Sequence, residues 1–212
     1  VMWQGLFIVT AVLIILSGLL VRQSTVQSAA AEVRVASNDA PIPWRRRGWW
    51  IVLAFVPSSL MLGVTNYFTS DIVSVPLLWI IPLSLYLLTF VFVFARRQIL
   101  PLCWSNRILP IAALALVFLM LIEATEPVWL LILVHLAFFF LAGMVCHGRL
   151  AEDRPGAARL TEFYLCLSIG GVLGGVFNAL IAPQLFASVA EYPLVIVLAC
   201  LMRGSAPPAT AP

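Results

Sequence analysis

The chain of 212 residues is 63% hydrophobic and only 10% charged, and its mean hydropathy is +1.08. A soluble domain is typically about half apolar and about a quarter charged, so this composition excludes a water-soluble core and predicts a lipid bilayer as the solvent. The formal net charge of +3 comes from arginines grouped at a few places, so we expect no nucleic-acid partner.

A helix that crosses the hydrocarbon core needs about 20 mostly apolar residues. On that criterion the sequence predicts an all-α, polytopic integral membrane helix bundle with six to seven transmembrane helices in a single domain, 1–212. The expected spans are 3–20, 50–68, 72–95, 108–122, 128–146, 162–182 and 185–203. The last is the weakest, because its apolar run 193–202 covers about half a bilayer at ~1.5 Å per residue, so it either spans or re-enters.

The connection 21–48 between the first two spans is polar, and we expect a flexible cytoplasmic linker there. The small residues and prolines of 204–212 predict a disordered tail. The linker ends in an arginine cluster beside two tryptophans, which predicts a membrane-surface anchor that contacts lipids, formed by Arg45, Arg46, Arg47, Trp49 and Trp50.

The placement of the arginines predicts the orientation of the chain. All twelve basic residues are arginines, and alternate threading of the spans puts every one of them on the same side. The other side receives only acids, namely Asp71, Glu123, Glu126 and Glu191. Because cytoplasmic loops retain basic residues, we expect cytoplasmic arginine-rich loops and a periplasmic chain start in a bacterial inner membrane. Arg203 fits this pattern only if the last run spans.

The sixth span carries small and polar residues at helical spacing. Ser168, Gly171, Gly175 and Asn178 share one face, and Gly170 and Gly174 flank it, which gives two overlapping GxxxG spacings. Small residues let helices approach closely in lipid, so we expect these six residues to form a tight packing seam. A phosphate-binding glycine loop would need a preceding strand, which the sequence does not predict.

Polar residues inside the other spans are candidates for a buried polar site. They are Ser59 and Asn66 on one face of the second span and His135 about eight residues into the fifth. A neutral, hydrogen-bonded imidazole is the structural alternative for His135. His147 lies beside Arg149 and is expected at the interface. The four cysteines are far apart and form no CxxC, so we expect reduced thiols, no metal site and no cofactor.

Several motifs resemble one bacterial family. They are WIVLAFVPSSLMLGVTNY at 50–67, TSDIVSVPLLWIIPL at 69–83, YLLTF at 86–90, HGRLA at 147–151, LTEFYL at 160–165, GGVLGGVFNALIAP at 170–183 and EYPL at 191–194. They resemble the membrane domain of the fused major-facilitator/spermidine-synthase proteins, the transmembrane aminopropyltransferase-like group, over roughly 44–203.

The resemblance implies a multi-helix membrane region that precedes a cytosolic aminopropyltransferase-type domain. Compared with that family, the chain is expected to lack the first several helices and the soluble domain, so no catalytic residue carries over and we expect no enzyme. The first functional hypothesis is a non-catalytic membrane scaffold or anchor. A structural subunit of a larger membrane complex, in contact with other membrane helices or subunits, is the alternative. A polyamine or small-cation transporter ranks third, because such a protein would place carboxylates inside its spans.

Overall fold

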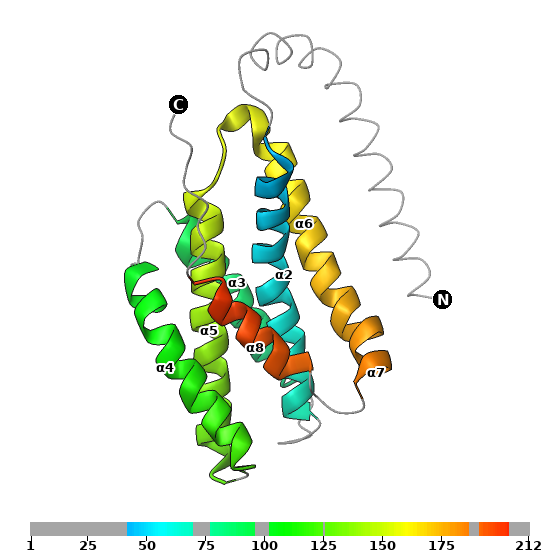
Figure 1. The fold of residues 1–212 in the computed structure, drawn as a ribbon. Coiled ribbons are helices and arrows are strands. Elements are labelled where there is room, and N and C mark those ends of the chain that lie inside the picture. Colours follow the sequence, from blue (N-terminus) through cyan, green and yellow to red (C-terminus); the bar gives the residue numbers. More distant parts are fainter. Residues whose placement is uncertain (1–41, 70–76, 96–101, 125, 187–190, 204–212) are drawn as a thin grey trace, which may run out of the picture. The chain divides into compact units, whose positions relative to one another are not determined.

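The computed structural model describes residues 42–69, 77–95, 102–124, 126–186 and 191–203, and these residues form helices and turns without any strand. The predicted span 3–20, most of the linker 21–48 and the tail 204–212 lie outside the described residues. The helices in chain order are α2 (Trp44–Tyr67), α3 (Ile80–Phe94), α4 (Leu102–Leu121), α5 (Val128–Glu152), α6 (Leu160–Val176), the π-helical turn η4 (Phe177–Ile181), α7 (Ala182–Leu185) and α8 (Glu191–Leu201) (Figure 1). The all-α prediction is confirmed for this part of the chain.

Four of the described helical runs are long and apolar enough to cross a membrane: Trp44–Tyr67, Leu102–Leu121, Val128–Glu152 and Ala157–Leu185. They correspond to the predicted second, fourth, fifth and sixth spans. The third and seventh predicted spans contain the shorter apolar helices α3 and α8, with 15 and 11 residues. The described residues therefore give four helices of membrane-spanning length.

One compact unit comprises Ile42–Pro155 and Leu160–Pro212. The 3-10 turn η3 (Ala157–Arg159) belongs to a second unit, and within it the backbone N–H of Arg159 donates to the carbonyl of Gly156 at 3.0 Å. Helices α2 to α8 all belong to the first unit.

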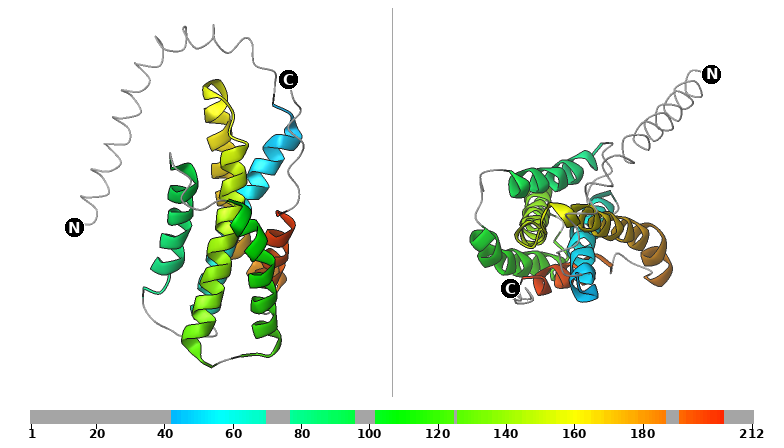
Figure 2. Two further views of the ribbon diagram at one scale, coloured as in Figure 1. Left: turned by 90° about the vertical axis from the view of Figure 1, so that its left-hand side faces the viewer. Right: turned by 90° about the horizontal axis from the view of Figure 1, so that it is seen from above.

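Helix α2 is the centre of this unit, because it packs against α3, α5, α6 and α8. Seen end-on, α2 lies between α6 on one side and the group of α3, α4 and α5 on the other (Figure 2). Helix α8 crosses α2 and contacts both α4 and α5 (Figure 1). The core between these helices is apolar and includes the fully buried side chains of Leu53, Leu60, Leu109, Phe138 and Phe163.

Helix α2 begins earlier than predicted. Its first residue is Trp44, after Pro43 in an extended conformation, so the arginine cluster lies in its first turn rather than in a linker. The helix extends to these residues because arginine is a good helix former. The arginines also find acidic partners in Asp153, directly after α5, and Glu162 on α6.

Local chemistry explains two further features, the end of α4 and the π turn after α6. Helix α4 ends in a Schellman motif, in which Glu123 has a φ of 49° and the N–H groups of Glu123 and Ala124 donate to the carbonyls of Met120 and Leu119. The helical run of α6 passes through the π turn η4 before Pro183. A proline inside a helix lacks an N–H donor and clashes with the preceding turn, which a wider π turn relieves.

Candidate functional site: the buried polar contacts between the helices

The closest approach between helices lies along α2 and α6. A β-carbon added to Gly170 would lie 2.4 Å from the carbonyl oxygen of Ile51, and one added to Gly174 would lie 2.9 Å from that of Phe55. Both neighbours are backbone atoms, which cannot rotate away as a side chain can. Glycine is therefore required at these two positions by the packing of α6 on α2.

Three side-chain hydrogen bonds join the same pair of helices or brace the contact. The Ser58 hydroxyl donates to the carbonyl of Gly171 at 2.9 Å. The amide nitrogen of Asn178 donates to the Ser59 hydroxyl oxygen at 2.6 Å and to the carbonyl of Gly174 at 3.0 Å. Ser59 and Asn178 are both buried, so the packing seam combines backbone contact with a hydrogen bond that has no competing water.

The seam lies on a different face of α6 from the predicted one. Gly171 and Gly175 have open space where a β-carbon would stand, and Ser168 is exposed and donates to the carbonyl of Tyr164 within its own helix. Neighbouring positions on a helix differ by about 100°, so the two overlapping GxxxG spacings point to different surroundings. Of the six predicted seam residues, Gly170, Gly174 and Asn178 are in the contact, and Gly171 contributes its carbonyl oxygen, which accepts from Ser58.

A second buried cluster joins α5, α8 and the end of α2. Nδ1 of His135 lies 2.9 Å from the Tyr192 hydroxyl, and both side chains are buried. The rings of Tyr67, His135 and Tyr192 are nearly parallel, with Tyr67 4.5 Å from the imidazole centroid. Nε2 of His135 is buried and has no hydrogen-bond partner among the described residues. Close contact with α8 again involves a glycine, since a β-carbon at Gly63 would meet the Tyr192 ring at 2.9 Å.

The three predicted members of the buried polar site do not come together. Ser59 pairs with Asn178 across the α2–α6 seam, whereas His135 pairs with Tyr192 on α8. Asn66 is exposed near the end of α2, so its assignment to a buried site is wrong. Ser59 and Asn66 are seven positions apart, about two helical turns, and so lie on one face of α2. Of the two, only Ser59 lies where α6 covers it.

Sequence analysis missed a third cluster, at the contact between α3 and α5. His147 is fully buried, and its Nδ1 lies 2.8 Å from the Thr89 hydroxyl oxygen. The Thr89 hydroxyl donates its only proton to the carbonyl of Tyr86 at 2.6 Å, so His147 must donate from Nδ1–H. Nearby, a β-carbon at Gly143 would lie 3.1 Å from Thr89, which shows how closely α3 approaches. The sequence signal was the polar Thr89 within an apolar helix.

The arginine cluster forms contacts within the protein. Arg46 makes an ion pair with Asp153 at 2.8 Å, and the buried Trp50 indole donates to the same carboxylate at 2.6 Å. Arg47 pairs with Glu162 at the start of α6 and also lies over the ring of Trp44. These contacts tie the first turns of α2 to α5 and α6.

The predicted membrane-surface anchor therefore needs correction. Trp50 is fully buried and Trp49 partly buried, while Arg46 and Arg47 are engaged by acids. Of the five predicted anchor residues, Arg45 alone is exposed. The sequence could not reveal this, because the acid that binds both Arg46 and Trp50 lies more than 100 residues along the chain.

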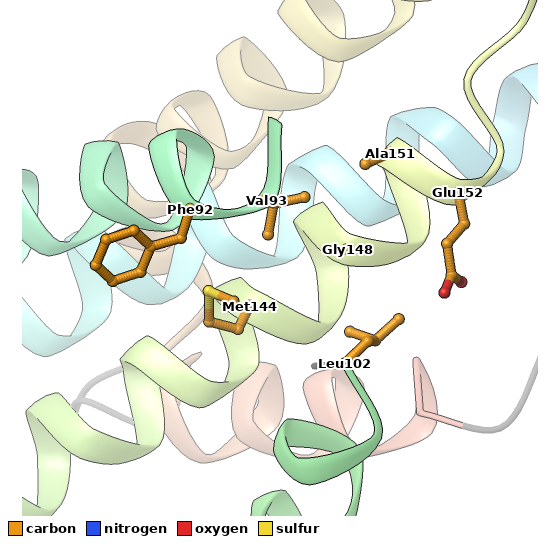
Figure 3. Close-up of a pocket in the computed structure, with 7 residues that line it drawn as sticks. All are labelled: Phe92, Val93, Leu102, Met144, Gly148, Ala151 and Glu152. Carbon is orange, nitrogen blue, oxygen red and sulfur yellow. The ribbon is translucent and has the colours of Figure 1, made fainter. Parts of the chain in front are cut away.

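One small pocket opens between the end of α3, the start of α4 and α5 (Figure 3). Its described lining residues are Phe92, Val93, Leu102, Met144, Gly148, Ala151 and Glu152, and the exposed Glu152 is the one charged residue among them. No group of three or more potential metal ligands occurs among the described residues.

Glu191 lies in a more buried position than the sequence suggested. It occupies the first turn of α8 and is buried, directly before Tyr192. An acid in the first turn of a helix is favoured by the helix dipole. Glu191 is adjacent in sequence to Tyr192, whose hydroxyl lies 2.9 Å from Nδ1 of the buried His135.

The comparisons with family models, curated proteins and solved structures give no match to this chain.

Proposed function

We propose that the chain is a non-catalytic, membrane-embedded scaffold or anchor domain, similar to the membrane portion of the transmembrane aminopropyltransferase-like proteins. The observation that carries the proposal is the α2–α6 seam, where Gly170 and Gly174 rest directly on the α2 backbone. A backbone-on-backbone contact braced by the buried Asn178–Ser59 hydrogen bond favours one fixed arrangement of helices. A fixed arrangement suits an anchor better than a machine that must rock between two states.

The proposal includes six to seven spans and cytoplasmic arginine-rich loops in a bacterial inner membrane. A contact between the last turn of α5 and the chain after α8 supports this threading, because the Arg149 guanidinium donates to the carbonyl of Arg203. Arg203 thereby lies at the same end of the bundle as the α5 terminus, where Arg46 also lies. That placement is the one required if α8 belongs to a segment that returns to the arginine-rich side.

A structural subunit of a larger membrane complex is the second candidate. It is favoured by the uncovered face of α6, where Gly171 and Gly175 have open space and Ser168 is exposed. Small residues on a lipid-facing helix allow another helix to approach closely. The full open reading frame separates the two candidates, since a downstream aminopropyltransferase-type domain supports the anchor and an early stop codon supports the subunit.

A polyamine or small-cation transporter remains the competing class, because Glu191 is buried beside the His135–Tyr192 cluster. The purified chain, reconstituted in liposomes with a membrane potential, should take up labelled putrescine and spermidine no faster than protein-free liposomes. We expect this result because an anchor needs no substrate path. Uptake that the Glu191→Gln variant abolishes would replace the scaffold proposal with a transporter.

A further inference from the structure

Large aromatic side chains are exposed at both ends of the bundle. Trp44 and Trp104 are 82% and 66% exposed and lie in the first turns of α2 and α4, and Tyr164 is exposed near the start of α6. Trp129, at the start of α5, is 68% exposed. By contrast, Trp50 is 0% exposed, so the exposed rings are not a general feature of the tryptophans.

The two groups lie at opposite ends. Helix α4 runs from its contact with α5 at Leu102 and Gly148 toward the turn before Trp129, so Trp104 and Trp129 are at opposite ends of one antiparallel pair. Trp44 begins α2 two residues before Arg46, which pairs with Asp153 after α5. Trp44 and Trp104 therefore belong to the arginine-rich end.

The length of α5 between the two ends of the bundle fits a bilayer. Trp129 and Arg149 on α5 are 20 positions apart, which is ~30 Å along a helix. The hydrocarbon core of a bilayer is about 30 Å thick. From Ile108 to the end of α4 the exposed side chains are apolar, and they include Ile108, Ile111, Leu114 and Phe118.

We infer that the two headgroup boundaries of the surrounding phospholipid bilayer lie at Trp44, Trp104 and Tyr164 on one side and at Trp129 on the other. The amphipathic rings of tryptophan and tyrosine are most favourable at the boundary between acyl chains and headgroups, where one edge is apolar and the polar N–H or O–H meets water. The inference deepens the membrane location contained in the proposed function, since it names the surfaces that contact lipid headgroups.

The buried His135–Tyr192 cluster lies below the boundary at Trp129. His135 follows Trp129 by six residues, which places it ~9 Å below that boundary along α5. The His135–Tyr192 hydrogen bond, and with it the buried Glu191, then lies within the hydrocarbon depth and is covered by protein rather than by water. Arg107, which follows Trp104 by three residues, is exposed and can extend its guanidinium to the same boundary.

The test is fluorescence quenching of single-tryptophan variants, made by changing the other tryptophans to phenylalanine, in bilayers whose acyl chains carry bromine at a shallow or a deep position. Trp44, Trp104 and Trp129 should each lose more emission with shallow than with deep bromine. Stronger quenching by deep bromine at any of the three overturns the assignment at that end.

The matched control is the variant that keeps only Trp50, whose buried ring should be quenched weakly at both depths. A second set of variants removes one exposed tryptophan at a time from the otherwise unchanged chain, which leaves the Trp50–Asp153 contact intact. In this set a boundary tryptophan is recognised because its removal lowers the part of the emission that shallow bromine quenches. If no tryptophan is quenched by any lipid, the chain has not inserted, and the membrane part of the proposed function fails as well. Normal insertion with deep quenching would contradict the boundary assignment alone.

Discussion

Replacing Gly170 with alanine should destabilise the helix bundle, whereas the same replacement at Gly171 should not. The new β-carbon at Gly170 would stand 2.4 Å from the Ile51 carbonyl oxygen and 2.7 Å from the Ala54 side chain. Helix α6 must then move away from α2, and overpacking of this kind costs about 1–3 kcal/mol in the free energy of unfolding. Thermal unfolding of the detergent-solubilised chain measures the difference.

Gly171 is the matched control, because it is the next residue in the same helix and no described residue lies within 4 Å of its β-carbon position. Alanine there should be neutral or stabilising by up to about 1 kcal/mol through helix propensity. The Ser58 bond to the Gly171 carbonyl involves the backbone and survives the change. Equal unfolding temperatures for the two variants would mean that α6 does not pack on α2 through Gly170. Gly174 and Gly175 form a second pair with the same expectation.

Replacing Asp153 with alanine should lower the free energy of unfolding by about 2–3 kcal/mol. The larger part comes from the buried Trp50 indole, whose N–H now donates to Asp153 at 2.6 Å and would be left without an acceptor. The smaller part is the ion pair with Arg46, whose side chains are 36% and 33% exposed and therefore screened by solvent. Thermal unfolding together with the Trp50 emission maximum follows both contributions.

Glu152 is the control for this change, because it is the adjacent acid on α5 and is exposed. Glu152→Ala should change the free energy of unfolding by less than about 0.5 kcal/mol. In the Trp50→Phe background, Asp153→Ala should lower the free energy of unfolding clearly less than in the original chain. The reason is that the indole N–H, which Asp153→Ala would leave without an acceptor, is absent from this background. Full additivity of the two changes would contradict the indole–carboxylate contact.

Much of the helical architecture could be predicted from hydropathy, because a continuous apolar run in a bilayer has to satisfy its backbone within a helix. The cores of α2, α4, α5 and α6 are where the sequence placed them. The start of α2 was predicted too late, because the arginines at Arg46 and Arg47 look like a solvated linker until their partners Asp153 and Glu162 are known.

The buried polar contacts were less predictable, since each depends on which helices become neighbours. The sequence shows that α6 has small faces, but the position of α2 decides that Gly170, rather than Gly171, is covered. His147 was expected at the interface because Arg149 is close in sequence, yet Thr89 of α3 covers it. Glu191 was expected on the side of the bundle that carries the acids, and the start of α8 at that residue buries it.

The most direct test of the scaffold account measures whether α6 keeps one position relative to α5. Spin labels at Leu133 of α5 and Leu173 of α6, both exposed, report the distance across α2 by double electron–electron resonance in bilayers. The account predicts a single narrow distance distribution that does not change when spermidine is added or the pH gradient is reversed. Two distances, or a shift on adding spermidine, would show that the bundle moves between states and would contradict the scaffold.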